Sequence, residues 1–78
     1  MSGIRNLTEA EKKANIFYKH RKEISAIGYQ YGVNTSVAAS MWAVQHKVHD
    51  PAAMTDWYNI CRQYIQAKDK TLGDLFRE

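Results

Sequence analysis

Apolar residues of this 78-residue chain recur every three or four positions over most of its length, which is the spacing of amphipathic helices. The first such segment runs from about residue 9 to about residue 31, and no proline divides it. One cationic turn, which contains His20 and Arg21, interrupts its apolar face. The pattern predicts a single long helix whose apolar face carries Ala10, Ala14, Phe17, Ile24, Gly28 and Tyr31.

A second helix is predicted after Gly32, a residue suited to end the first one. Asn34 or Thr35 caps this second helix, which should end near Val48. Its spacing predicts one apolar stripe formed by Val37, Met41, Val44 and Val48.

The third helix has the clearest start signal, because Asp50 stands directly before Pro51. Asp caps free amide groups, and proline at the first helical position loses no hydrogen bond. This helix should extend to about Ala67. Its amphipathic face carries Met54, Trp57, Tyr58, Cys61, Tyr64 and Ile65.

Two pairs of polar residues have the spacing of a helix cap. Thr8 with Glu11 forms a capping-box pattern, and Thr71 with Asp74 is suited to cap a last turn. That turn carries Leu72, Leu75 and Phe76. The predicted fold is all-α, a three-helix bundle with a short C-terminal helical turn, in one domain over residues 1–78.

The cysteine content and the apolar segments of the chain bear on its cellular compartment. Cys61 is the single cysteine, which excludes an internal disulfide, and the N-terminus lacks the apolar run of a secretory signal. We therefore expect a cytoplasmic protein. No segment is long and apolar enough to span a bilayer, so we expect no membrane partner.

The net charge of +3 is unevenly distributed, because residues 1–22 carry six Lys and Arg but two Glu. Tyr18 lies within this basic third, off the main apolar stripe, beside Lys19, Arg21 and Lys22. Exposed tyrosine next to basic side chains is typical of protein-binding surfaces and of platforms that stack single-stranded nucleic acid. A solvated face is the third interpretation. Tyr29 and Ile60 also lie off the main stripes of their helices.

Residues 24–42 resemble helix-turn-helix domains, which need a small residue at the helix crossing and a glycine at the turn. Gly28 and Gly32 occupy those positions. The resemblance implies a DNA-binding transcriptional regulator. Such a regulator would be a dimer that places its second helix in the DNA groove. Its candidate DNA-binding residues are Asn34, Thr35, Ser36 and Ser40, among which Asn34 alone has a side chain suited to bidentate base contacts.

Two further segments are similar to the theta subunit of bacterial replicative DNA polymerase: LysAlaAsnIle at 13–16 and ProAlaAlaMetThrAspTrpTyr at 51–58. Aligning both requires an insertion of about two helical turns, so the similarity concerns the fold and assigns no functional residue.

Few residues of the chain are candidates for metal binding or catalysis. His46 and His49 are three residues apart and could form a metal site with His20 or Cys61. Structural zinc sites usually bring four ligands in paired spacings, so we expect no metal and no cofactor. The sequence has no glycine-rich phosphate loop and no nucleophile elbow, and we expect no enzymatic activity.

These features favour a small non-catalytic binding protein. We expect an accessory or inhibitory factor that binds a larger protein assembly handling nucleic acid, such as a phage-type modulator of a host enzyme. On this interpretation the protein-binding residues are Tyr18, Lys19, Arg21 and Lys22. The alternative is the helix-turn-helix regulator.

Overall fold

The computed structural model describes residues 6–67 and 69–77, which form six helices and no strand. The chain is therefore all-α, as predicted, but it is not the three-helix bundle that the sequence pattern suggested. In order, the helices are α1 (Glu9–Ala14), α2 (Ile16–Lys19), α3 (Arg21–Tyr31), α4 (Thr35–Gln45), α5 (Pro51–Gln66) and α6 (Leu72–Arg77).

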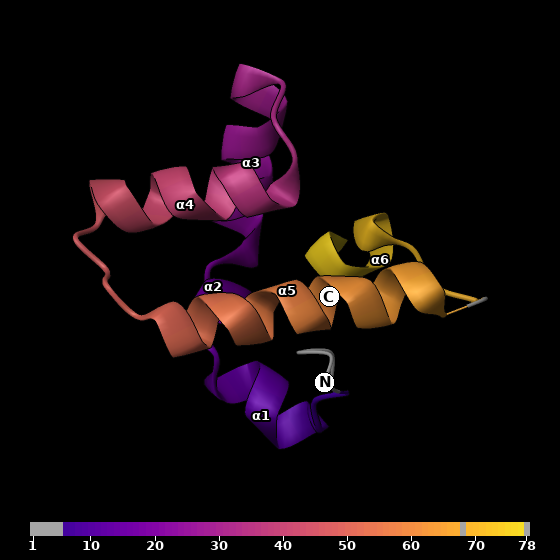
Figure 1. Ribbon diagram of the computed structural model, residues 1–78. Coiled ribbons are helices and arrows are strands. Elements are labelled where there is room, and N and C mark those ends of the chain that lie inside the picture. The colour runs from indigo at the N-terminus through magenta and orange to yellow at the C-terminus, as the bar shows by residue number, and fades with distance from the viewer. Residues whose placement is uncertain (1–5, 68, 78) are drawn as a thin grey trace.

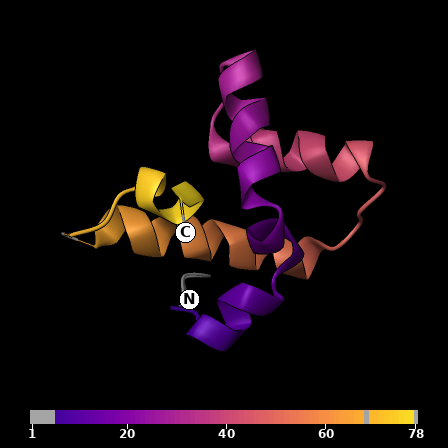
Figure 2. The same cartoon turned by 180° about the vertical axis from the view of Figure 1, so that it is seen from behind.

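Helix α5 lies across the middle of the molecule, with α1 on one side and α3, α4 and α6 on the other (Figure 1). Helix α3 stands upright relative to α5, and α4 packs across α3. The view from behind shows the same arrangement, with α2 lying between α1 and α3 (Figure 2). The short helix α6 folds back onto α5 and also contacts α3.

The predicted capping signals are confirmed. The Thr8 hydroxyl accepts a hydrogen bond from the Glu11 backbone N–H at 3.2 Å, and the Glu11 carboxylate accepts one from the Thr8 N–H. The Asp50 side chain accepts from the Ala53 N–H at 3.1 Å at the start of α5. Thr71 and Asp74 cap α6 through reciprocal bonds between backbone and side chain. Each cap satisfies amide groups that have no partner within their own helix.

The prediction of one continuous helix over residues 9–31 is wrong, because the chain breaks at Asn15 and again at His20. The Asn15 side-chain oxygen accepts hydrogen bonds from the N–H groups of Phe17 and Tyr18, at 2.9 and 3.1 Å. The Asn15 side-chain amide donates to the Ala53 carbonyl of α5 at 2.9 Å. Asn side chains compete in this way with the helical hydrogen-bond pattern. Asn15 therefore ends α1, starts α2 and ties both to α5.

The buried face of α4 is also different from the predicted stripe. The fully or largely buried residues of α4 are Ala38, Ala39, Trp42 and Ala43, whereas Val37 and Val44 are exposed. The cause is the close approach of α3, where a Cβ atom on Gly28 would lie 3.2 Å from the Val33 carbonyl oxygen and 3.8 Å from the Ala38 Cβ. Only small side chains of α4 fit against this crossing. The helix ends at Gln45 rather than near Val48, and Lys47 follows with a left-handed φ of 55°.

Trp57 of α5 is completely buried, as its spacing predicted. Ile60 is also completely buried, so the expectation that it lies off the packed face of its helix is wrong. Helix α5 lies between α1 on one side and α6 on the other, so more than one of its faces is covered (Figures 1 and 2). The largest fully buried side chains are Trp57, Tyr64, Phe17, Ile24, Ile60 and Leu75.

Replacing Asn15 tests its double role. Asn15→Ala removes two cap hydrogen bonds and leaves the Ala53 carbonyl without its donor, so we expect a loss of about 2 to 4 kcal/mol in the free energy of unfolding. Asn15→Ser keeps a cap acceptor but cannot reach Ala53, and should lose roughly half as much. Urea unfolding followed by circular dichroism measures both. Equal stabilities of the parent and the alanine variant would contradict this role.

Trp57→Ala should lower the free energy of unfolding by about 3 to 5 kcal/mol, because it leaves a large cavity in the core. Trp57→Phe should cost clearly less, since the Trp57 indole N–H has no hydrogen-bond acceptor among the described residues. Thermal and urea unfolding of the two variants provide the comparison. A similar loss in both would mean that the shape of the indole, and not apolar volume, decides the packing.

Candidate protein-binding groove

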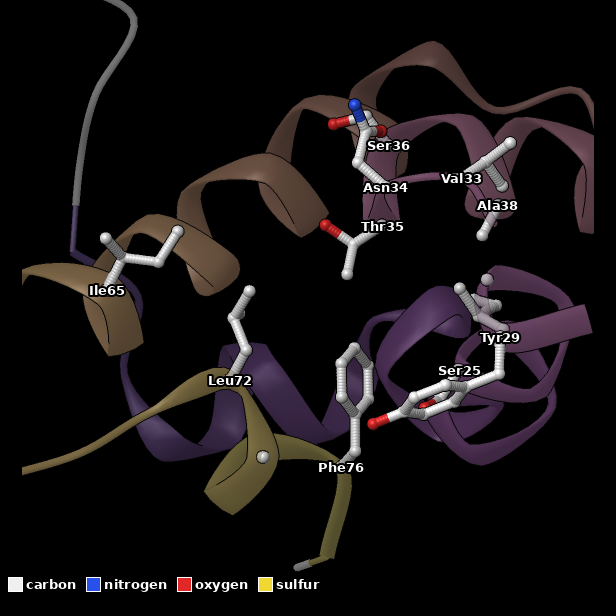
Figure 3. Close-up of a pocket in the computed structure, with 13 residues that line it drawn as sticks. Ser25, Tyr29, Val33, Asn34, Thr35, Ser36, Ala38, Ile65, Leu72 and Phe76 are labelled. Atoms are coloured by element: carbon white, nitrogen blue, oxygen red, sulfur yellow. The ribbon is translucent and has the colours of Figure 1, made fainter. Parts of the chain in front are cut away.

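A groove of about 540 Å³ lies between α3, the start of α4 and α6, and α5 contributes one residue to its lining. Figure 3 shows Leu72 and Phe76 of α6 facing Thr35 and Ala38 of α4 across this space. The apolar residues of the lining are Ile24, Tyr29, Val33, Ala38, Ile65, Leu72 and Phe76, and the polar ones include Ser25, Asn34, Thr35 and Ser36. We call this surface the α3–α6 groove. Its apolar floor is suited to receive an apolar side chain or helix.

Local sequence features hold the walls of the α3–α6 groove in place. Gly32 has a left-handed φ of 63°, which turns the chain so that Val33 donates its N–H to the Gly28 carbonyl at 3.1 Å. On the opposite wall, Leu75 is fully buried and anchors α6. The Arg21 guanidinium of α3 donates to the Leu75 carbonyl at 2.9 Å and so joins the two walls.

Two apolar side chains of the α3–α6 groove are largely exposed. Tyr29 is 88% exposed and Ile65 is 63% exposed, although both belong to the lining. Tyr29 comes from α3 and Ile65 from α5, on opposite sides of the hollow (Figure 3). Exposed aromatic and aliphatic residues around a hollow are typical of surfaces that bind another protein.

The four residues predicted to bind a protein partner divide into two groups. Tyr18 is only 6% exposed, so the expectation that it is a surface residue is wrong. The Arg21 guanidinium lies 4.2 Å from the centre of the Tyr18 ring and also donates to the Tyr18 carbonyl at 2.9 Å. Tyr18 and Arg21 therefore stabilise the fold. Lys19 and Lys22 are exposed.

Lys22 belongs to the groove side of α3. It precedes Ser25 by three residues and Tyr29 by seven, so these three residues share one face of the helix. Ser25 and Tyr29 line the α3–α6 groove, whereas Lys22 lies one turn before Ser25 on the same helix face and is not part of the lining. At the other wall, Arg77 pairs with Asp74 and approaches Gly73 of the lining.

The four candidate DNA-binding residues lie at the start of α4 and along it. The Asn34 side-chain oxygen already caps α4 by accepting from the Val37 N–H at 2.9 Å. The Ser40 hydroxyl donates to the Ser36 carbonyl at 3.1 Å, and Thr35 makes a side-chain hydrogen bond with Cys61. Asn34, Thr35 and Ser36 line the α3–α6 groove, so the structure brings these three together, whereas Ser40 lies outside it.

The histidines are placed around an aromatic side chain. His20 and His46 stack on Trp42, with ring centroids 4.8 and 4.5 Å from that of the indole. His20 also contacts the Glu23 carboxylate at 2.6 Å. Within residues 6–67 and 69–77, no group of three or more His, Cys, Asp or Glu side chains is arranged to hold a metal ion.

Cys61 is buried on α5, where its spacing predicted a packed residue. Burial raises the pKa of the Cys61 thiol to about 11, while the hydrogen bond with Thr35 acts in the opposite direction. A thiol in this state is a poor nucleophile at neutral pH. The burial and the raised pKa of Cys61 therefore agree with a packing role.

No protein-family model matches this chain, and no curated protein or solved structure shows significant similarity to it. Among the helices of the described residues, none is both long and apolar enough to cross a membrane.

Sequence reasoning missed most of the α3–α6 groove. The sequence pattern indicates an exposed position for Tyr29, because this residue lies off the main apolar stripe of its helix. Leu72 and Phe76 are four residues apart, a spacing that places both on one face of α6, but the pattern does not show that this face borders α3. Ile65 was assigned to the packed face of its helix and is exposed.

The raised pKa of Cys61 predicts how its contribution depends on pH. Below the ordinary thiol pKa of 9.0 the group is neutral in both states, and the stabilisation by the buried thiol is fully present. As the pH rises from 9.0 to about 11, the unfolded chain loses its proton first and this stabilisation is lost. The difference in unfolding free energy between the parent and Cys61→Ala should therefore shrink over this interval. Urea unfolding at a series of pH values measures it, and a constant difference would contradict the assignment.

Proposed function

We propose that this protein is a small non-catalytic binding protein that receives a segment of a larger protein in the α3–α6 groove. The observation that carries the proposal is the exposure of Tyr29 and Ile65 at the edge of an apolar hollow. Covering these two side chains removes apolar surface from water, which is the main source of binding energy in such contacts. Large aromatic anchors next to a pocket commonly dominate that energy.

The chemistry of the groove favours an amphipathic helix as the bound segment. Its apolar face would cover Leu72 and Phe76, and an acidic residue beside that face would pair with Lys22. Charge of this sign steers the encounter and fixes the orientation of the segment. The exposed lysines of the N-terminal third, Lys13, Lys19 and Lys22, support our proposal that the partner belongs to an assembly handling nucleic acid, on which the protein acts as an accessory or inhibitory factor.

The helix-turn-helix regulator stays a prediction supported by one observation. Helices α3 and α4 are joined at Gly32, whose left-handed backbone is the one that this turn requires. Against it, α4 carries no basic residue from Thr35 to Gln45. The test is binding to a random duplex pool at about 50 mM salt, where a DNA-binding domain binds and loses affinity steeply as salt is raised.

Replacing Tyr29 tests the proposed groove directly. Tyr29→Ala should weaken partner binding by about thirtyfold, a typical effect for an aromatic anchor, and should leave the fold intact because the ring is exposed. Tyr58→Ala is the matched control, since Tyr58 is a half-exposed tyrosine outside the groove lining. Partners captured from a nuclease-treated lysate of the source cells would be compared for the parent and both variants. Equal recovery with Tyr29→Ala and the parent would overturn the proposed site.

Charge reversal at Lys22 tests the orientation. Lys22→Glu should weaken binding of a synthetic amphipathic helix with acidic flanks by about fivefold to tenfold, and should improve binding of the same helix with basic flanks. Arg21 is unsuitable for this experiment, because its reversal also breaks the contacts with Leu75 and Tyr18. Lys13→Glu, an exposed lysine on α1, is the matched control. An identical effect of both reversals would mean that only net charge matters.

A further inference from the structure

A second hollow, of about 350 Å³, lies beside the C-terminal half of α5. It is lined by Lys12 of α1, by Gln63, Tyr64 and Gln66 of α5, and by Lys70, which precedes α6. We call it the Lys12–Lys70 pocket. Among the described residues that line it, two are lysines and none is acidic. It shares no lining residue with the α3–α6 groove.

The Lys12 side chain carries its charge into the interior at this pocket. Lys12 is only 4% exposed, and its ammonium group lies 2.7 Å from the Glu9 carboxylate and 5.1 Å from the centre of the Tyr64 ring. A lysine ammonium has three N–H donors. Within residues 6–67 and 69–77, Glu9 is the one hydrogen-bond acceptor that Lys12 meets. Buried donors are normally all satisfied, so Lys12 has donors to offer to oxygen atoms of a ligand.

Lys70 brings a second positive charge to the same aromatic ring, with its ammonium group 5.2 Å from the centre of Tyr64. The hydrogen bond and the charge of Lys12 hold the pKa of the Glu9 carboxyl below its usual range. The charges of Lys13 and Lys70 lower this pKa further. Three lysines around one carboxylate leave an excess of two positive charges, which attracts an anion with two negative charges.

The wall of the pocket is held in place before any ligand binds. The Leu7 N–H donates to the Gln63 side-chain oxygen at 2.9 Å, and the Gln63 side-chain amide donates to the Leu7 carbonyl at 3.3 Å. These two bonds fix the segment before α1 against α5. Asn6 and Gln66 are exposed residues of the lining, and their side-chain amides provide further N–H donors for ligand oxygens.

We propose that the Lys12–Lys70 pocket binds the phosphate group of a phosphate monoester. Such a group carries about −1.5 to −2 charges at pH 7 and three acceptor oxygens, which suit the excess charge and the ammonium and amide donors. A carboxylate or a phosphodiester carries one negative charge and fits this charge less well. The volume of the pocket leaves room for the group that the phosphate is attached to. The site goes beyond the groove and its protein partner.

Titration with adenosine monophosphate tests the pocket. At about 50 mM salt it should shift the backbone amide NMR signals of Gln63, Tyr64 and Gln66, with a Kd of about 1 mM or below. Inorganic phosphate should compete for the same site, and adenosine, which lacks the phosphate, should leave these signals unchanged. Absence of shifts at about 10 mM adenosine monophosphate, or equal shifts with adenosine, would overturn the proposal.

Three variants test the role of charge in this binding. Lys70→Gln should weaken it by about tenfold, the effect of one charge-assisted hydrogen bond. Lys47→Gln is the matched control, because it removes an exposed lysine before the opposite end of α5 and changes the net charge equally. Glu9→Gln should strengthen binding by about threefold to tenfold, since it removes the carboxylate that competes for Lys12. Equal weakening by Lys70→Gln and Lys47→Gln, or weaker binding by Glu9→Gln, would overturn the site.

Two short single strands, one with a 5′-phosphate and one with a 5′-hydroxyl, identify the source of the monoester. Tighter binding of the phosphorylated strand than of adenosine monophosphate supports a nucleic-acid end, and equal binding supports a small molecule. Equal binding of both strands would overturn the monoester in favour of the phosphodiester backbone. Tyr29→Ala should keep phosphate binding and Lys70→Gln should keep partner binding, so this proposal and the proposed function fail separately.

Discussion

The hydrogen bonds of Asn15 determine the course of the whole N-terminal half. By capping Phe17 and Tyr18 and donating to Ala53, this one side chain ends α1 and fixes the start of α2 on α5. A continuous helix over residues 9–31 would keep α3 in line with α1. The break at Asn15, together with the second break at His20, instead lets α3 stand upright on the opposite side of α5, where α4 and α6 pack against it (Figure 1). The α3–α6 groove depends on this change of direction.

The crossing of α3 and α4 explains why apolar residues remain exposed on α4. Gly28 and Ala38 allow the helices to approach closely, and this contact turns the small residues of α4 inward. Trp42 supplies the bulk that the alanines lack, since it packs against Phe17, and both His20 and His46 stack on it. The valines of α4 consequently face outward.

Some charged side chains of this protein stabilise the fold, whereas others are exposed to solvent. Arg21 appears in the sequence as part of a basic cluster, yet its guanidinium bonds to two carbonyl groups and covers the Tyr18 ring. Lys12 is similarly buried, with its ammonium group 2.7 Å from the Glu9 carboxylate and 5.1 Å from the centre of the Tyr64 ring. Lys22 stays exposed to solvent. A count of basic residues therefore overstates the charge that is free to meet a protein partner.

The sequence alone determined the all-α class, the caps at Thr8, Asp50 and Thr71, the extent of α5 and the burial of Trp57 and Cys61. These features depend on contacts within a few residues or on strong amphipathic spacing, which a linear pattern contains. The sequence alone did not determine the break at Asn15, the inward face of α4 or the α3–α6 groove. Each of these depends on a contact between segments far apart in the chain, such as Asn15 with Ala53 or Arg21 with Leu75. Which of two apolar faces a helix buries is decided by the shape of its neighbour, and only the tertiary structure supplies that shape.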